Sequence, residues 1–501
     1  MIFIYLISAV AAILFMKFYL YKRRIMKYVG HLPAPPEIPI VGSGLYFIGK
    51  NTVEIMDMLC MTTEMFETPC RFWLGPFLAV FLGRPEDVQT VLLSPKCLAK
   101  PYLYSFMDDN IGLFTAPLHI WKPQRKLLNP TFNNKILLSF IPIFNDKARI
   151  LAEVLGKKVG EEAFDISKQF YACTLETVCS TTIGVDLDFQ SNKNVKMLET
   201  MESQTTLVAN RMLKFWLHPQ WIYKWTNDYK IFRREAPHVY EIPQSIRKLK
   251  EKEFYEKKYF ENNDELKEDE FFSTPQIFVN ELFKLHHKKL IDDKLLDDQI
   301  ISMLVAGNDT TALTMSHIIL MLAMHPEVQE KAFQEIKDCH ETQTSLSDAE
   351  ILAKLVYLEM CVKESMRLFP VGPFMGRQTT DDVQLSNCIV PKGTMLILSC
   401  HHLHRNKEVW GPNADLFDPD NFLPEKVASR HAYSYLPFSG GARNCIGIKY
   451  AWMSMKIFLS AIMRQYKFST HLRLEDIVTK FEILLKIENR HMVTIERREK
   501  Y

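Results

Sequence analysis

Ten residues near the C-terminus, 438–447 (FSGGARNCIG), restrict the fold of this chain more than any other segment. Gly440 and Gly441 permit a tight turn, and an apolar helix is predicted directly after it. Cys445 therefore lies just before a helix N-terminus, where backbone N–H groups and the helix dipole favour a thiolate. A lone thiolate with no Cys or His nearby suits one strong axial bond to a metal. The alternative for any single cysteine is an inert core thiol, which would need neither the glycine turn nor Arg443.

The residues around Cys445 indicate which metal group this is. Haem iron accepts a cysteine thiolate, which favours cleavage of an O–O bond. Arg443 lies two residues before Cys445 and can pair with a haem propionate. Gly447 leaves room where a flat macrocycle would press on the following helix. We therefore predict a haem site with Cys445 as the ligand of the iron.

Composition excludes several other classes. The ten cysteines are scattered without a CxxC pair, so neither a zinc ribbon nor a disulfide scaffold is expected. Lys and Arg total 61 and Asp and Glu total 59, so the net charge of +2 gives no reason to expect a nucleic-acid partner. Helical patterns dominate, and only residues 77–82 and 394–400 are predicted as strands. The mixed charges of residues 247–270 indicate a solvated helix and loop.

The N-terminal segment reads as a membrane anchor. Residues 1–21 are apolar apart from Lys17, and four basic residues follow between positions 22 and 27. This order predicts an uncleaved transmembrane helix with the rest of the chain in the cytosol. A cleaved signal peptide, the alternative, would carry its charge before the apolar core. The basic and proline-rich residues 22–44 are expected to be a hinge, with an ordinary loop as the alternative, and residues 45–501 one mainly α domain with small β-sheets.

A long helix is predicted over residues 297–325. It is apolar around nearly its whole circumference, which is typical of a helix in the centre of a large protein. Its middle is polar (AGNDTT, 306–311), which suggests a local opening for a ligand or water. Asp309 and Thr310 place an acid beside an alcohol, a candidate proton relay. The alternative, slightly favoured by this segment taken alone, is a polar patch satisfied by neighbouring backbone.

Glu364 and Arg367 lie three residues apart on one predicted helical face. Such pairs are usually surface salt bridges. The apolar residues on both sides argue instead for a buried, structural ion pair, which would be costly to break.

Taken together, these motifs resemble the cytochrome P-450 superfamily of haem-thiolate monooxygenases. FSGGARNCIG, which begins at Phe438, matches the haem-binding loop FxxGxRxCxG at every fixed position, AGNDTT matches the oxygen-activating helix, and ESMR matches ExxR. The WxxxR motif is matched by Trp121 and Arg125, which the resemblance implies contact haem propionates. Arg377 resembles a further propionate-binding arginine by its position. The resemblance implies the cytochrome P-450 fold, with a single large haem-binding domain.

Finer resemblance points to the microsomal, fatty-acid ω-hydroxylase-like clan common in insects, through YLEMCVKESMRLFP and HHLHRNKEVWGPNADLFDPDNFLPE. Many members have an acidic residue that can attach to haem where this chain has Ala306. Non-covalent haem b is therefore implied. Many have an arginine where this chain has Asn421, so the Glu364–Arg367 pair must find another partner.

The resemblance also implies an activity. One oxygen atom of O2 enters a C–H bond of a small apolar substrate, a fatty acid, hormone-like lipid or xenobiotic, and Asp309 and Thr310 supply protons. Electrons come from NADPH through cytochrome P-450 reductase at the endoplasmic reticulum membrane, with cytochrome b5 as a second candidate donor. A docking face for the reductase is expected to include Lys122, Lys126, Arg430 and Lys449, with scattered solubilising side chains as the alternative for each one. The aromatic segment 200–240 would cap the substrate channel, with core packing as the alternative.

Two other functions stay open at this point. One is a haem-thiolate enzyme that rearranges oxygenated lipids without O2, although such relatives usually lack the equivalent of Thr310. The other is a membrane-anchored haem binder or sensor without catalytic activity.

Overall fold

The central feature of the fold is a single long helix. The structure is a computed structural model that describes residues 1–38, 41–107, 112–191, 195–256, 277–341 and 347–499. Helix α13 (Asp293–Met324) crosses the body, and apolar residues such as Ile300, Met315 and Ile318 are fully buried on it. The side chain of Asp292 caps its first turn by accepting a hydrogen bond from the Leu295 N–H. The predicted core helix is confirmed and begins a turn earlier than expected.

The body contains further helices besides α13. They are α2 (Thr52–Met65), α3 (Pro85–Leu93), α4 (Leu118–Leu128), α5 (Asn134–Ser139), α6 (Ile141–Gly156), α7 (Ser167–Val178), α8 (Val195–Leu213), α9 (Gln220–Tyr223), α10 (Asn227–Glu256), α12 (Ile277–His287), α14 (Pro326–Glu341), α15 (Asp348–Lys354), α16 (Val356–Leu368), α17 (Cys400–Leu403), α18 (Lys407–Trp410), α19 (Pro424–Ala428) and α20 (Ile448–Met463). Helices α7, α16 and α20 contact α13 directly.

The glycine in the middle of α13 serves this packing. A Cβ atom at Gly307 would lie 2.8 Å from a methyl group of Val178, so α7 approaches closely only because no side chain is present. The helix runs through this segment without a break. The predicted local opening of the backbone is therefore wrong, because close helix packing accounts for the glycine.

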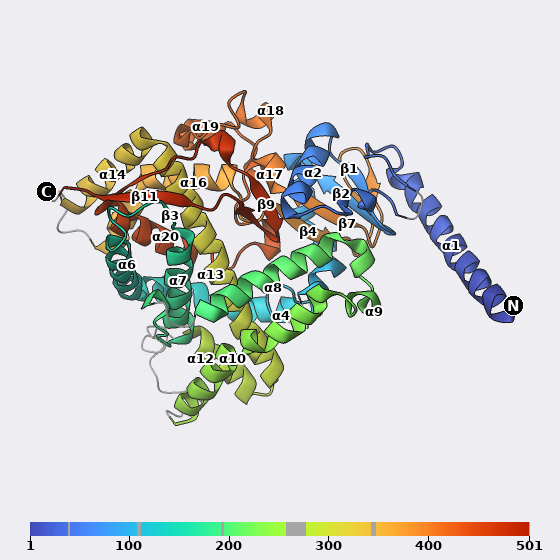
Figure 1. Ribbon diagram of the computed structural model, residues 1–501, viewed down its shortest axis with the longest axis horizontal. Helices are drawn as coiled ribbons and strands as arrows, with labels where there is room; N and C mark the ends of the chain where they lie inside the picture. The colour runs from blue at the N-terminus through green and yellow to red at the C-terminus, as the bar shows by residue number, and fades with distance from the viewer. Residues whose placement is uncertain (39–40, 108–111, 192–194, 257–276, 342–346, 500–501) are drawn as a thin grey trace.

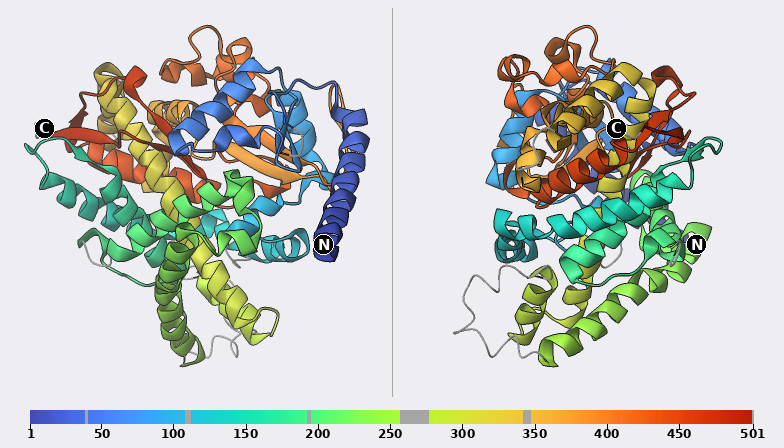
Figure 2. Two further views of the ribbon diagram at one scale, coloured as in Figure 1. Left: turned by 45° about the vertical axis from the view of Figure 1, so that its right-hand side comes forward. Right: turned by 90° about the vertical axis from the view of Figure 1, so that its left-hand side faces the viewer.

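The main sheet has four strands in the order β1–β2–β7–β4. These strands are β1 (Cys70–Leu74), β2 (Phe77–Leu82), β7 (Met395–Ser399) and β4 (Phe374–Gln378). Strand β2 pairs in parallel with β7, which confirms both predicted strands. This pairing joins two segments that lie about three hundred residues apart in the sequence. Smaller sheets are formed by β3 (Phe164–Asp165), β11 (Met492–Arg497) and β8 (Tyr466–Ser469), by β5 (Val383–Gln384) and β6 (Ile389–Val390), and by the hairpin β9 (Thr479–Glu482)–β10 (Leu484–Ile487). The main sheet lies near the N-terminal helix, away from α10 and α12 (Figures 1 and 2).

The N-terminal helix α1 (Ile2–Val29) projects from the body (Figure 1). It continues through the basic residues, since the first proline is Pro33. The predicted hinge over residues 22–44 stays a prediction. Only its last turns pack on the body, where Ile25 and Val29 are buried. Within the described parts of the chain, no helix has both the length and the apolarity to cross a bilayer. The transmembrane helix predicted over residues 1–21 is not supported by this finding.

The charged residues 247–270 fall into two parts. Residues 247–256 belong to α10, which confirms the helix. Lys248 and Lys252 are exposed as expected, whereas Lys250 is buried and Arg247 pairs with Asp297. The remainder of the run lies outside the described residues.

Candidate active site

The Cys445 loop is held in one conformation by its backbone. The N–H of Cys445 donates to the carbonyl oxygen of Phe438 at 3.0 Å, and that of Asn444 donates to Gly441 at 3.2 Å. Gly441 has φ +67°, and a Cβ atom there would lie 2.0 Å from the Leu92 carbonyl oxygen, so only glycine fits. Helix α20 starts at residue 448. Cys445 thus lies directly before a helix N-terminus, as predicted.

The thiol of Cys445 is distinct from the other cysteines. Cys445 alone among the ten is exposed, and the others are buried or half-buried. Protein still surrounds the sulfur closely, and this burial raises the pKa of the Cys445 thiol, while the N–H of Gly447 and the charge of Arg125 lower it. The N–H of Gly447 at the helix terminus thus favours the thiolate as predicted, while burial opposes it. A cationic metal would supply the missing stabilisation.

Three buried cations gather close to this loop. The Arg443 guanidinium lies 4.3 Å from the ring centroid of Trp121, and Nη2 of Arg377 donates to Ser439 Oγ at 3.2 Å. The Lys100 ammonium lies 4.4 Å from the Tyr104 ring centroid. Burial lowers the pKa of Lys100 well below its usual value, and the charges of Arg377 and Arg443 lower it further.

These cations lack anionic partners. In the described part of the chain none of them pairs with a carboxylate, and Nε and Nη1 of Arg443 have no hydrogen-bond partner. Two carboxylates would satisfy this group, and a haem carries two propionates, so the residues fit the cofactor. Lys100 was missed by the sequence analysis, because an isolated lysine before a proline belongs to no motif.

Arg125 has a different contact from the one expected. Its Nη1 and Nη2 donate to the backbone carbonyl and the side-chain oxygen of Asn444, both at 2.8 Å. It therefore ties α4 to the residue before Cys445. Its predicted contact with a propionate stays a prediction, whereas Trp121 of the same motif lies against Arg443.

The polar middle of α13 divides into two parts. Asn308 is fully buried, and its Oδ1 accepts a hydrogen bond from Thr174 Oγ1 at 2.6 Å, so the satisfied-patch alternative holds for this residue. Asp309 and Thr310 remain as the candidate acid and alcohol. The Thr310 hydroxyl donates to the Ala306 carbonyl at 2.7 Å. Burial raises the pKa of Asp309 to about 6, so the group can both take up and release a proton near neutral pH.

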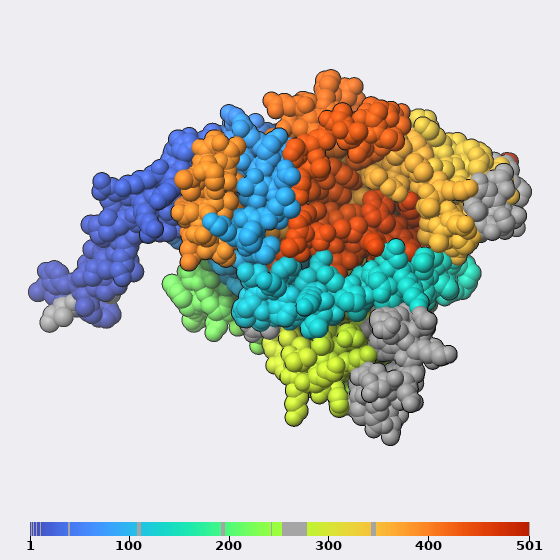
Figure 3. Space-filling view, turned by 180° about the vertical axis from the view of Figure 1, so that it is seen from behind, coloured from blue at the N-terminus to red at the C-terminus, as the bar shows by residue number. Residues whose placement is uncertain are grey.

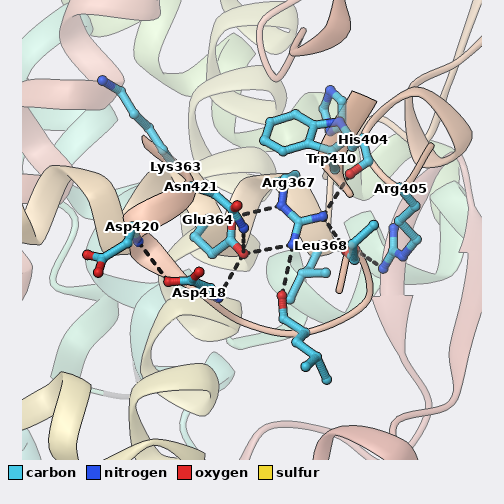
Figure 4. Close-up of polar contacts among 12 residues, drawn as sticks. Lys363, Glu364, Arg367, Leu368, His404, Arg405, Trp410, Asp418, Asp420 and Asn421 are labelled. Atoms are coloured by element: carbon cyan, nitrogen blue, oxygen red, sulfur yellow. Dashed lines mark hydrogen bonds and ion pairs between the residues drawn. The ribbon is translucent and has the colours of Figure 1, made fainter. Parts of the chain in front are cut away.

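The Glu364–Arg367 pair lies in the core, with both residues 0% exposed and 2.7 Å between Oε1 and Nη2 (Figure 4). The surface alternative is therefore excluded. Glu364 Oε1 also accepts from the Asp418 N–H at 2.8 Å and from Asn421 Nδ2 at 3.1 Å. Asn421 thus supplies a hydrogen bond at the position where the family resemblance leads us to expect an arginine.

Arg430 places a second positive charge near this pair. Its guanidinium donates to the Asn421 carbonyl oxygen and lies 4.0 Å from the Trp410 ring centroid, which Arg367 also contacts at 4.9 Å. Burial lowers the pKa of Arg430, and the negative charge of Glu364 opposes this by raising it. Arg430 is half-buried and engaged by these contacts, and its predicted place on a docking face stays a prediction.

An apolar cavity lies between the main sheet, α8 and the β9–β10 hairpin. Its lining includes Phe72, Met212, Phe374, Phe481 and Ile483, with Tyr104 as its polar member. The aromatic segment 200–240 contributes to this lining. Trp221 and Trp225 of that segment are 71% and 86% exposed, so core packing does not explain these two residues.

Comparison with known proteins agrees with this geometry. Residues 32–495 match the family described as Cytochrome P450. Among similar proteins, Probable cytochrome P450 313a4 of Drosophila melanogaster is 30% identical over 496 residues, which cover 95% of this chain and 96% of the relative. Cytochrome P450 4c3 of the same species is 30% identical over 495 residues, which cover 95% of this chain and 91% of the relative. Cytochrome P450 4V2 of Homo sapiens is 29% identical, over 92% of this chain and 88% of the relative. The predicted resemblance to insect members is confirmed. The chain therefore belongs to the cytochrome P450 family, as a monooxygenase whose cofactor is haem b, held non-covalently with a cysteine thiolate as axial ligand.

Proposed function

We propose that this enzyme hydroxylates an apolar lipid, with fatty acids as the first substrate class, using O2 and electrons from NADPH. The observation that carries this proposal is the cavity bounded by Phe374, Phe481 and Ile483, because an almost wholly apolar lining selects an apolar chain. The resemblance to the fatty-acid ω-hydroxylase-like clan supports the same class.

In this proposal each group of residues has a separate task. Haem with an axial thiolate supplies O–O cleavage and C–H oxidation. Cys445 would hold the iron, and Arg377, Arg443 and Trp121 would hold the carboxylates. Phe438 and Gly447 shape the loop that faces the porphyrin.

Asp309 and Thr310 would supply the protons that the reaction consumes. Thr310 would offer its hydroxyl to bound oxygen, and Asp309 would exchange protons, because burial raises its pKa to about 6. The apolar cavity wall excludes water from the substrate.

The proposal is tested by product analysis. The holoenzyme is combined with NADPH and cytochrome P-450 reductase in phosphatidylcholine vesicles, with dodecanoate as probe and isotopically labelled O2. We expect hydroxydodecanoate that contains one labelled oxygen atom, and no product from the Cys445→Ala variant. Product that forms without NADPH, or that takes its oxygen from water, would contradict a monooxygenase acting on this class.

We also propose attachment to the endoplasmic reticulum membrane through α1, with the catalytic domain in the cytosol. The first half of this helix carries exposed apolar side chains, among them Phe3, Leu6 and Leu14, and Lys22–Lys27 would lie on the cytosolic side. Exposed Trp221 and Trp225 would make a second contact. Extraction of membranes with alkaline carbonate distinguishes an integral anchor, which stays, from a peripheral one, which is released.

The reductase would dock on the face that carries the Cys445 loop. Lys122, Lys126 and Lys449 are exposed there, and the cyan segments near residue 130 share this face with the red-orange segments near residue 450 (Figure 3). We expect replacement of Lys122 and Lys126 by Glu to slow electron transfer from the reductase in a salt-dependent way. Cytochrome b5 would use the same face.

A further inference from the structure

Two buried glutamines link the central helix to the helix that carries Trp121. Gln299 lies on α13 and Gln124 on α4, and these residues are 2% and 7% exposed. Nε2 of Gln299 donates to Oε1 of Gln124 at 2.6 Å, and Oε1 of Gln299 accepts from the Leu113 N–H at 3.2 Å. The two glutamines, here called the amide chain, therefore end at the backbone of the loop before α4.

The backbone fixes how both amide groups point. The Leu113 N–H can only donate, so the oxygen atom of Gln299 must face it and the nitrogen atom must face Gln124. Gln124 in turn presents its oxygen atom, and its Nε2 has no hydrogen-bond partner in the described part of the chain. A buried donor without a partner lowers stability, so an apolar side chain at this position would favour folding more. Stability alone therefore does not account for this amide.

The loop that the amide chain reaches is a compact turn, residues 112–116. The N–H groups of Thr115 and Ala116 donate to the carbonyl oxygen of Gly112, at 3.1 and 3.0 Å. A Cβ atom at Gly112 would lie 1.8 Å from Ser302 Oγ on α13, so the turn lies directly on the central helix only because this residue is glycine. The amide chain thus holds a turn that already contacts α13.

The same turn also reaches the site. The Ala116 carbonyl oxygen accepts a hydrogen bond from Arg443 Nη2 at 2.9 Å. The centroid of the Phe114 ring lies 4.8 Å from Nζ of Lys100 and 5.7 Å from the centroid of the Tyr104 ring. Tyr104 lines the apolar cavity, whereas Lys100 and Arg443 belong to the cations that fit the propionates. The turn therefore joins the wall of the cavity to this group of cations.

We propose that Gln299 and Gln124 are positioning residues that set where the substrate chain is oxidised, by holding turn 112–116 against α13. This inference rests on the proposed function. The hydrogen bond that fixes Leu113 also fixes its neighbour Phe114 beside the cavity wall. A misplacement of about 1 Å changes the rate of reaction at a given atom greatly. Loss of this hydrogen bond should therefore broaden the set of products and not stop the reaction.

The experiment measures the ratio of hydroxydodecanoate isomers made by the holoenzyme with NADPH, reductase and dodecanoate. In Gln299→Met the Leu113 N–H loses its acceptor, and we expect the share of the main isomer to fall about two-fold or more. Gln299→Glu keeps an oxygen atom for Leu113, and Gln124 can turn its amide to donate to the second oxygen atom. The wild-type ratio should therefore return in Gln299→Glu, and a ratio equal to that of Gln299→Met would contradict the inference.

Gln329→Met is the matched control. Gln329 is 1% exposed, and its Nε2 donates at 2.9 Å to the carbonyl oxygens of Leu322 and Phe468. These hydrogen bonds join α14 to the end of α13 and to β8, away from turn 112–116. A general loss of stability would affect both variants, so the isomer ratio should keep its wild-type value in Gln329→Met.

A second measurement does not need turnover. Hydrogen exchange at the Leu113 N–H of the holoenzyme should be about five-fold faster or more in Gln299→Met, because an ordinary hydrogen bond is lost there. The wild-type rate should remain in Gln329→Met. An exchange rate or an isomer ratio that is the same in wild type and Gln299→Met, or that changes as much in Gln329→Met, would overturn the inference. A wild type that makes no hydroxydodecanoate would instead contradict the proposed function, and the exchange rates would still decide whether the amide chain holds the turn.

Discussion

At the scale of single residues, the site is built from groups that lack partners of their own. Arg443 has two unpaired nitrogen atoms in the interior, and Lys100 is buried beside two arginines. Burying such charges is costly unless an anion completes the set. These residues therefore fit a ligand with two carboxylates, and we expect each of them to contribute to its retention.

Lys100→Met should release haem faster. Removing one cation from a buried, charge-assisted contact costs about 1.5–3 kcal/mol, which corresponds to roughly ten-fold or more in the rate of haem loss. Transfer of haem from the holoenzyme to apomyoglobin measures this rate. Lys96→Met is the control, because Lys96 pairs with exposed Asp381. Equal rates in the two variants would show that Lys100 does not hold a carboxylate.

Asp309→Asn should stabilise the protein above pH 6. The pKa of Asp309 rises from 3.8 to about 6 on folding, so the folded state binds the proton more tightly and the free energy of unfolding falls as pH rises between these values. The gain in Asp309→Asn is at most about 3 kcal/mol at pH 7.5 and disappears below about pH 4. Thermal unfolding of both holoenzymes across this range is the measurement. A difference in Tm that stays constant with pH would contradict it.

At the scale of elements, the buried ion pair supports the Cys445 loop through a chain of hydrogen bonds. Nη1 of Arg367 donates to the His404 carbonyl oxygen at 2.8 Å, and Nε2 of His404 accepts from the Leu436 N–H at 2.8 Å. Burial lowers the pKa of His404 to about 3, so this ring stays neutral and can accept. The Leu436 carbonyl then accepts from Ser439 at 3.2 Å. Helix α16 is thereby connected to the loop that precedes α20.

Arg430→Met should weaken this support. The variant loses a charged hydrogen bond to Asn421 and a contact with the Trp410 ring, together about 2 kcal/mol. We expect a smaller share of the ferrous–CO complex to show the thiolate-type absorption band after mild heating. Lys426→Met, an exposed neighbour, should behave as wild type. A band that is retained equally in both variants would remove Arg430 from the support of the loop.

At the scale of the whole molecule, the first half of α1 is nearly independent of the body. The first turns of α1 are exposed, whereas Phe18 and Tyr21 contact Trp73 edge-on with centroids 6.4 and 6.5 Å apart. Folding of the body therefore depends on the end of α1 and not on its beginning.

Removal of residues 2–16 should separate stability from membrane binding. We expect the Tm of the shortened holoenzyme to stay within about 2 °C of the full chain, since the lost side chains bury little surface. Flotation with phosphatidylcholine vesicles should show much weaker binding. Unchanged flotation would place membrane contact elsewhere, for example at Trp221 and Trp225.

The sequence by itself determined the Cys445 loop, the central helix with Asp309 and Thr310, and the Glu364–Arg367 pair. Each depends on neighbours within ten residues, where turn geometry and helical periodicity are local. Only the tertiary structure places Lys100 in the field of Arg377 and Arg443, brings Arg430 to Asn421 and Trp410, and shows that Gly307 allows α7 to pack closely on α13. These depend on burial and on charges brought together from distant segments, and neither quantity can be read from local spacing.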